Sequence, residues 1–82
     1  MNFVYFLKSQ STGRFYIGKT SNLKERMSQH QRGKVYSTRR FVPWILVYFE
    51  AYGDLDRATI RERKLKQFGS AYAGLLNRLS YK

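Results

Sequence analysis

Two short runs of aromatic and β-branched residues lie close together near the start of the chain, at residues 3–7 and 15–18. The segment between them, residues 9–13, is small and polar and ends in Gly13. Two such runs joined by a short segment containing glycine are typical of a β-hairpin. The sequence therefore predicts a fold that begins with a pair of paired strands.

A third strand is expected at residues 44–49, where six consecutive apolar or aromatic residues follow Pro43. Proline is tolerated at the first position of a strand but not in its middle, because it has no N–H for the ladder. The sheet is therefore predicted to have three strands.

The first helix is expected over residues 22–31. Ser21 is placed to cap it, because a serine hydroxyl can accept a hydrogen bond from a first-turn N–H group. Gly33 stands where a C-terminal cap belongs. Residues 32–43 then form the one long loop of the chain, and this loop is basic.

Two further helices are expected after the third strand. Asp54 can cap a helix that runs to about residue 68 and is closed by Gly69. Residues 70–79 carry leucines at helical spacing and predict the last helix. The helices thus fill the spaces between and after the strands.

The size and charge of the chain restrict its function. Its 82 residues suit one small domain over residues 1–82, and a net charge of +11 attracts a polyanion, most often nucleic acid. A ribosome-associated or anionic-membrane role is the alternative. The absence of cysteine excludes disulfides and thiolate zinc sites. The apolar N-terminus is too short for a span and lacks signal-peptide features, so we expect a cytoplasmic protein without a membrane segment.

Polar residues fall close to the apolar face of the first expected helix. At 100° per residue, Leu23 and Met27 point inward, and Arg26 and His30 lie on the flank of the same stripe, one turn apart. The side chains of Arg26 and His30 can therefore point into one pocket.

The second expected helix places a carboxylate, Glu62, on its apolar face. The residues that share this face are Leu55, Ala58 and Leu65. A carboxylate at a buried edge needs a cation. This cation could simply be Arg61 or Lys66, and the sequence leaves that alternative open.

Each remaining candidate also has an ordinary structural explanation. His30 could be a helix C-terminal residue that the helix dipole favours. Arg26 alone is more often a solvated basic side chain, and Tyr5 and Tyr16 are two of seven tyrosines that could sit at the rim of the core. The candidates are informative only as a set.

As a set, they resemble the GIY-YIG nuclease family, whose signature is a Gly-Ile-Tyr-like tripeptide on one strand and Tyr-Ile-Gly on the next. The second tripeptide is intact at residues 16–18, and the first is Phe-Val-Tyr at residues 3–5, which departs at two positions but keeps Tyr5. The downstream match runs through residues 18–26, His30, Gly33, residues 37–39, Pro43, Trp44 and residues 58–66. The similarity covers residues 3–79 and is greatest to short, free-standing bacterial members.

The resemblance implies an α+β fold, a three-stranded antiparallel sheet flanked by about three helices, and a metal-dependent DNA endonuclease. In such an enzyme Glu62 would hold one Mg²⁺ or Mn²⁺, and Arg26 would stabilise charge on the scissile phosphate. Tyr5 is similar to the tyrosine proposed as general base, with Tyr16 hydrogen-bonded to the nucleophile or phosphate. His30 could instead assist the water, and the sequence does not separate these two roles.

A tyrosine base has a consequence for pH dependence. The ordinary pKa of a phenol is ~10, so Tyr5 could act as a base only if cations such as Arg26, Lys19 and the metal favour its ionised form. The sequence therefore predicts a rate that rises toward alkaline pH.

The number of carboxylates favours a single metal ion. The acidic residues of the chain are Glu25, Glu50, Asp54, Asp56 and Glu62. With Asp54 expected as a helix cap, this set is too small for a carboxylate-rich two-metal site. Asn77, on the last expected helix, is a further candidate because it could match an asparagine of some family members.

Basic residues outside the catalytic set are expected to contact phosphates, which supply affinity without sequence information. They are Lys19, Lys24, Arg32, Lys34, Arg39 and Arg40. Recognition of a DNA structure, or a protein partner that supplies specificity, is then more plausible than reading of a long site. The alternatives are a non-catalytic nucleic-acid-binding module and an RNA-associated protein with exposed aromatics such as Tyr36 and Trp44.

Overall fold

A computed structural model describes residues 1–81 of the chain. Its elements, in chain order, are β1 (Asn2–Ser9), β2 (Phe15–Thr20), α1 (Leu23–Gln31), the 3₁₀ turn η1 (Arg39–Phe41), β3 (Trp44–Tyr52), α2 (Leu55–Lys66) and α3 (Ser70–Arg78). The expected hairpin, third strand and three helices are all confirmed, and each strand extends beyond the run that predicted it. None of the helices in the described part is both long and apolar enough to cross a membrane.

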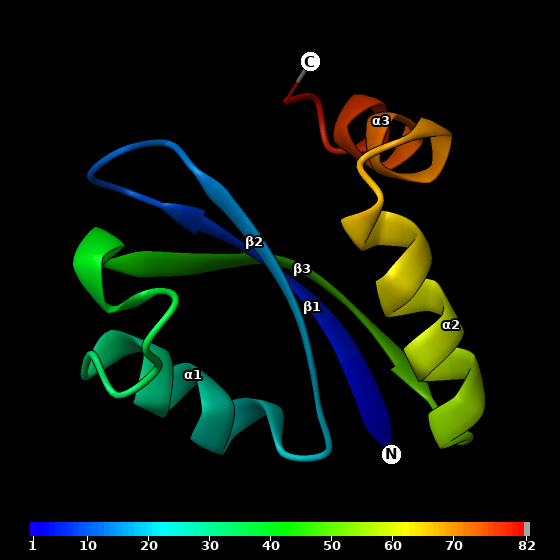
Figure 1. The fold of residues 1–82 in the computed structure, drawn as a ribbon, viewed down its shortest axis with the longest axis horizontal. Helices are drawn as coiled ribbons and strands as arrows, with labels where there is room; N and C mark the ends of the chain where they lie inside the picture. The colour runs from blue at the N-terminus through cyan, green and yellow to red at the C-terminus, as the bar shows by residue number, and fades with distance from the viewer. Residues whose placement is uncertain (82) are drawn as a thin grey trace.

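The sheet is antiparallel throughout, and its strand order is β2-β1-β3, so the N-terminal strand lies in the middle (Figure 1). Tyr5 pairs with Gly18 on one side and with Phe49 on the other. The middle strand is therefore hydrogen-bonded along both edges. The α+β class expected from the sequence is confirmed.

Alternate residues of β1 point into two separate cores. Val4 and Phe6 pack with buried residues of α2 and α3, such as Leu65. Tyr5 and Leu7 pack on the opposite face with Trp44 and with partly buried residues of α1. The helices accordingly lie on both sides of the sheet, with α1 separated from α2 and α3 (Figure 1).

Helix caps agree with the sequence in one case and differ in another. Asp54 caps α2, because its Oδ1 accepts a hydrogen bond of 2.9 Å from the Asp56 N–H. The cap of α1 is Asn22, whose Oδ1 accepts from the Glu25 N–H at 3.1 Å, and the expectation of Ser21 is wrong by one position. Both residue types can cap, so sequence preference does not separate neighbours.

The second helix ends earlier than expected, at Lys66. The chain turns at Phe68, which has a φ of 57°, and Gly69 is the N-cap of α3 and does not close α2. Leu55 was expected on the inner face but is 53% exposed, because it begins the helix at the rim of the sheet. Gly33 has a φ of 71° and follows α1 as predicted.

The long loop between α1 and β3 is anchored by buried residues. Val35 and Thr38 are buried within it, and the indole of Trp44 donates a hydrogen bond of 3.0 Å to the Thr38 carbonyl. Trp44 is only 3% exposed, so its expected role as an exposed aromatic is wrong. Tyr36, by contrast, is 79% exposed.

Candidate active site

Tyr5 lies in the middle of the sheet against the backbone of Gly18. The two residues are paired across β1 and β2, and the phenol ring occupies the space above the glycine. A Cβ at Gly18 would overlap the hydroxyl oxygen and ring of Tyr5. The glycine of the Tyr-Ile-Gly tripeptide is therefore required by the position of Tyr5.

The hydroxyl of Tyr5 begins a chain of buried hydrogen bonds. Tyr5 Oη and His30 Nε2 are 2.8 Å apart, and His30 Nδ1 and Thr38 Oγ1 are also 2.8 Å apart. The Thr38 hydroxyl in turn donates to the Val35 carbonyl at 3.4 Å. This last bond orients the chain: Thr38 accepts from Nδ1–H, which leaves Nε2 as the acceptor for Tyr5 O–H.

Burial sets the protonation states of this chain. It raises the pKa of Tyr5 to about 12, although the hydrogen bond and positive charge of Arg26 act in the opposite direction. It also lowers the pKa of His30 to about 4, and the positive charge of Arg26 contributes to this shift. At neutral pH both side chains are therefore uncharged, and Arg26 does not make Tyr5 a phenolate in the resting protein.

His30 has no free nitrogen with which to contact a water molecule. Its side chain is fully buried, and both ring nitrogens are hydrogen-bonded within the protein. The alternative in which His30 assists the water directly therefore finds no support in this geometry. Any effect of His30 on a bound ligand must pass through Tyr5.

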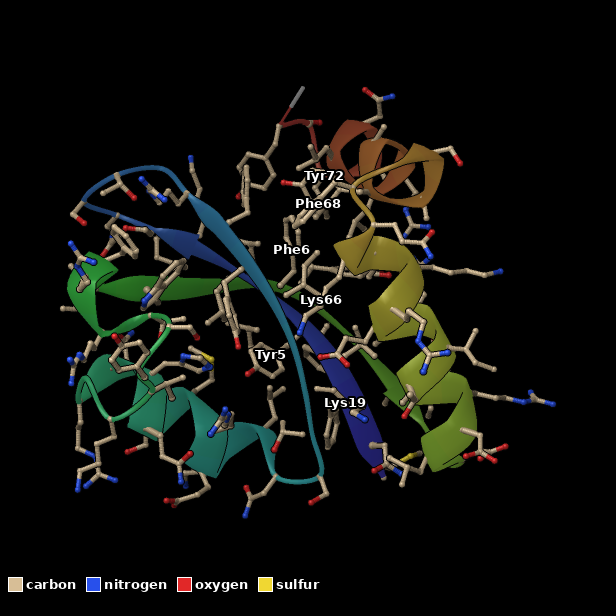
Figure 2. All side chains as sticks on the ribbon, viewed as in Figure 1. Tyr5, Phe6, Lys19, Lys66, Phe68 and Tyr72 are labelled. Carbon is tan, nitrogen blue, oxygen red and sulfur yellow. The ribbon has the colours of Figure 1, made fainter. Side chains whose placement is uncertain are left out.

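Tyr16 places a second phenol beside this chain. Its ring centroid lies 6.3 Å from that of Tyr5 and 5.2 Å from that of His30. From the other side, Lys66 Nζ lies 6.0 Å from the centre of the Tyr16 ring. Residues of β1, β2, α1 and α2 thus meet where β2 passes between the two helices, and Figure 2 shows Lys66, Tyr5 and Lys19 in this region.

Glu62 contributes a carboxylate to the same region. Its negative charge is among the influences that raise the pKa of Tyr5, although burial is the main cause. Glu62 Oε2 forms an ion pair with Lys66 Nζ at 3.1 Å, and only 18% of the Glu62 side chain is exposed. Of the two alternative partners expected from the sequence, Lys66 is therefore the actual one. Arg61 instead binds Glu50 at 2.8 Å.

Comparison with known proteins shows the family to which the chain belongs. The family model described as the GIY-YIG catalytic domain matches residues 1–74 of this chain. The chain belongs to the GIY-YIG family. Membership of the GIY-YIG family points to a nuclease and to DNA as its substrate.

The chain is also similar to three UPF0213 proteins. The chain is 38% identical over 68 residues to the UPF0213 protein CPE1444 of Clostridium perfringens, covering 82% of this chain and 72% of that protein. It is 38% identical over 65 residues to the UPF0213 protein plu4503 of Photorhabdus laumondii, covering 78% and 62% respectively. The solution NMR structure of the UPF0213 protein BH0048 of Bacillus halodurans is 30% identical, with a TM-score of 0.59 over 96% of this chain and 85% of that chain.

GIY-YIG nucleases generally use a divalent metal, and the donors present here fit an ion held by one carboxylate. No group of three or more His, Cys, Asp or Glu side chains converges within the described residues. Mg²⁺ is commonly bound by one or two carboxylates together with waters and substrate phosphates. Glu62 fits this role because its carboxylate already balances a cation, the ammonium group of Lys66.

The six residues expected to contact phosphate differ in their surroundings. Lys19 Nζ donates a hydrogen bond of 2.9 Å to Thr59 Oγ1, so this lysine links β2 to α2 beside Glu62. The remaining five are exposed on α1 and the loop that follows it: Lys24, Arg32, Lys34, Arg39 and Arg40. Asn77 is exposed on α3, and its side chain forms no hydrogen bond with Tyr5, Arg26 or Glu62.

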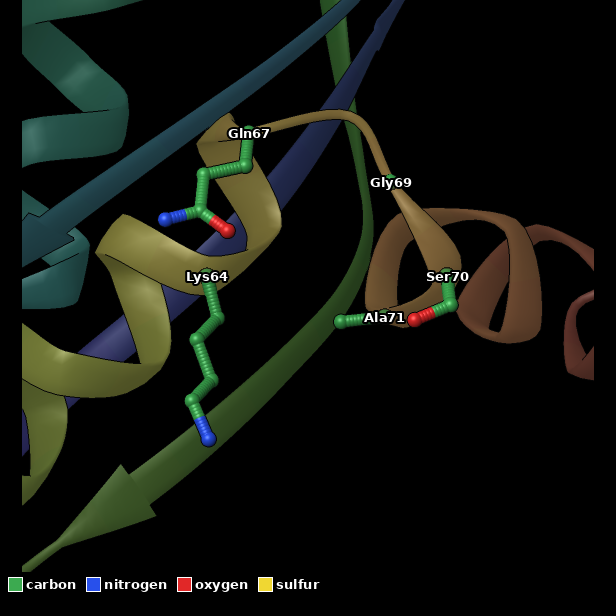
Figure 3. A pocket seen from close by; sticks show the side chains of 5 residues that line it. All are labelled: Lys64, Gln67, Gly69, Ser70 and Ala71. Carbon is green, nitrogen blue, oxygen red and sulfur yellow. The ribbon is translucent and has the colours of Figure 1, made fainter.

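A hollow of about 380 Å³ lies apart from these residues, at the junction of α2 and α3 (Figure 3). Its walls are formed by Lys64, Gln67, Gly69, Ser70 and Ala71. Its walls do not include Tyr5, Tyr16, Arg26, His30 or Glu62, so the hollow is separate from the candidate site.

Two residues that contact the candidate site residues were not predicted as members of the site. Thr38 binds the far side of His30, and Lys66 occupies the carboxylate of Glu62. Lys66 was named only as a structural partner, although its spacing of four residues from Glu62 predicts the pair. Thr38 has no comparable signal, because its contact depends on how the loop folds back over α1.

Proposed function

We propose that this protein is a metal-dependent endonuclease that hydrolyses phosphodiester bonds in DNA, with structure-directed or weakly sequence-specific recognition. The observation that carries the proposal is the position of Tyr5, whose ring centroid lies 6.3 Å from that of Tyr16, while Lys66, the ion-pair partner of Glu62, lies 6.0 Å from the centre of the Tyr16 ring. The charges of Arg26 and Glu62 both act on the buried Tyr5 phenol. A packing role for Tyr5 would not require either charge. In phosphodiester hydrolysis, by contrast, an arginine can stabilise charge on the phosphoryl oxygens and a carboxylate can hold a metal ion.

Arg26 and Glu62 have complementary roles in this proposal. The guanidinium of Arg26 offers a fixed set of donors for phosphoryl oxygens, on which negative charge increases as water attacks. Glu62 would hold one Mg²⁺ or Mn²⁺, which when bound supplies a Lewis acid for the scissile phosphate and the leaving 3′ oxygen. Lys66 must release the Glu62 carboxylate for this to occur.

Tyr5 and His30 act together as the base. The hydroxyl oxygen of Tyr5 accepts a proton from the attacking water while its own proton moves to His30 Nε2. Tyr5 then remains a neutral phenol, and His30 becomes an imidazolium whose Nδ1–H stays bonded to Thr38. The direction of the hydrogen-bond chain supports this relay, because Nε2 is the acceptor.

The relay changes the pH dependence expected from the sequence. A Tyr5 phenolate with a pKa of about 12 would make the rate rise throughout the alkaline range. In the relay the titrating base is His30, whose pKa of about 4 leaves it neutral at every pH above 6. We therefore expect a flat rate from pH 6 to 9 when chemistry limits turnover. A rate that increases tenfold with each pH unit would instead support a Tyr5 phenolate as the base.

The decisive experiment is cleavage of labelled duplex, single-stranded, nicked and branched DNA with Mg²⁺, Mn²⁺ or EDTA. Glu62→Gln and Arg26→Met should each abolish metal-dependent cutting. Glu25→Gln is the matched control, because it removes an exposed carboxylate of α1 and should leave cutting unchanged.

Other outcomes of this experiment would contradict the proposal. Cutting in EDTA, or cutting that survives Glu62→Gln, would exclude the metal role of Glu62. DNA binding with no cutting of any substrate would favour a non-catalytic nucleic-acid-binding module. Tight binding of RNA without metal would favour the RNA-associated alternative.

A further inference from the structure

The loop between α1 and β3 presents an aromatic ring to solvent. Tyr36 is 79% exposed, and the guanidinium of Arg39 lies 4.7 Å from the centre of its ring. A second pair of the same kind lies at the end of η1, where Arg14 from the β1–β2 turn is 4.5 Å from the centre of the Phe41 ring. The surface of this loop therefore combines aromatic faces with arginine side chains.

The positive charge of this surface is not neutralised locally. No Asp or Glu occurs in the sequence between Glu25 and Glu50, whereas the same interval contains several arginines and a lysine. Arg39 and Arg40 are both exposed. Such a surface attracts the phosphate backbone of a nucleic acid.

Although Tyr36 is exposed, the backbone that carries it is fixed. Its neighbour Val35 is buried, and so is Thr38, two residues further on. The Thr38 backbone also receives a hydrogen bond from the buried indole of Trp44. The ring of Tyr36 is therefore presented from an anchored position, which reduces the entropy lost when a ligand binds it.

The same loop is joined directly to the catalytic tyrosine. Thr38 Oγ1 is hydrogen-bonded to His30, and His30 is hydrogen-bonded to Tyr5. Tyr36 thus stands two residues from the end of the buried chain that begins at Tyr5.

We infer that Tyr36 and Arg39 form a stacking site for an unpaired base in the DNA that the protein cuts. The inference rests on the proposed function and specifies its substrate class. One face of the Tyr36 ring is covered by Arg39, and the other is free to stack. Aromatic side chains stack on any base, but a base within a continuous duplex is already stacked on its neighbours. The site therefore selects flaps, bulges and single-stranded junctions over intact duplex.

The test is binding in EDTA, where no cutting occurs. Fluorescence anisotropy compares a blunt duplex with the same duplex carrying an unpaired adenine replaced by 2-aminopurine. We expect the wild type to bind the unpaired form about 5- to 150-fold more tightly, which corresponds to one stacking contact of about 1–3 kcal/mol. Binding should also quench 2-aminopurine fluorescence, which reports stacking directly.

Three variants separate stacking from charge and folding. Tyr36→Leu should lose the preference and the quenching while its affinity for the blunt duplex is unchanged. Tyr36→Phe keeps the ring and should retain both, and Tyr81→Leu, which changes another exposed tyrosine, should behave as the wild type. Equal binding of the two DNAs by the wild type would overturn the inference, as would unchanged quenching in Tyr36→Leu. Equal loss on both DNAs would also overturn it.

The same experiments distinguish DNA from RNA as the ligand, and they test the stacking site separately from the nuclease activity. Stronger quenching with an RNA strand of the same sequence would assign the site to RNA and overturn the DNA assignment. Quenching that depends on Tyr36 in a protein that cuts nothing would support the stacking site while contradicting the nuclease. Cutting without quenching would contradict the stacking site alone.

Discussion

Acid should destabilise this protein through its single histidine. In the unfolded chain His30 titrates with its ordinary pKa of 6.5, whereas burial lowers its pKa in the fold to about 4. Between these values the unfolded state binds a proton that the folded state rejects. The stabilisation is therefore complete above pH 6.5 and is lost as pH falls toward 4.

The size of the effect follows from the two pKa values. The pKa of His30 falls from 6.5 in the unfolded chain to about 4 in the fold. At about 1.4 kcal/mol for each pKa unit, the largest loss in the free energy of unfolding is about 3 kcal/mol. About 2 kcal/mol of this should be lost between pH 7 and pH 5. The carboxylate of Glu50, with a pKa lowered from 4.5 to about 2, contributes only below pH 4.5 and therefore not between pH 7 and pH 5.

Urea unfolding followed by the fluorescence of the buried Trp44 measures this loss at pH 7, 6 and 5. In His30→Gln, which keeps an amide near Tyr5 but does not titrate, the free energy of unfolding should be nearly constant over this range. NMR titration of the only imidazole in the chain should show no protonation until pH is near 4. An imidazole midpoint near 6.5, or an equal pH slope in His30→Gln, would refute the reasoning.

Three further changes test other contacts. Gly18→Ala should lower the free energy of unfolding by about 1–3 kcal/mol, because its Cβ would overlap Tyr5. Thermal unfolding would measure this loss, and a structure of the variant would show the displacement of the Tyr5 ring. Lys66→Met should tighten Mn²⁺ binding to Glu62 by about fivefold in calorimetry, because it removes a partly exposed ion pair of about 1 kcal/mol. Weaker binding would contradict competition between Lys66 and the metal for this carboxylate. Glu50→Gln should cost about 2–3 kcal/mol at pH 7 in urea unfolding and almost nothing at pH 2, and equal losses at both pH values would show that its charge is unimportant.

The strands and helices were predictable because each follows from a local pattern. The runs around Tyr5 and Tyr16 are rich in the aromatic and β-branched residues that strands favour, and Asp54 directly precedes the helix that it caps. Ser21 failed because its neighbour Asn22 is an equally good cap, and only the path of the chain chooses between them. Local chemistry thus determines the type of an element better than its boundary.

The residues of the candidate site were predictable from the sequence, but their protonation states were not. Periodicity placed Arg26 on the flank of one apolar stripe and Glu62 within another, and in the structure the charges of both act on Tyr5. It did not show that burial would outweigh Arg26 and raise the pKa of that phenol. Desolvation depends on every atom packed around a group, so it cannot be obtained from spacing along the chain. Trp44 was misjudged for the same reason, since its cover comes from residues distant in sequence.

The position of Tyr5 on the central strand ties the chemistry to the global stability of the fold. Because β1 is hydrogen-bonded on both edges and its side chains enter both cores, the backbone of this residue can leave the sheet only when nearly the whole molecule opens. Amide exchange on this strand should therefore be as slow as global unfolding. Evolution can alter such a site only at the cost of the fold, and new substrate preferences would have to arise in the loop that carries Tyr36.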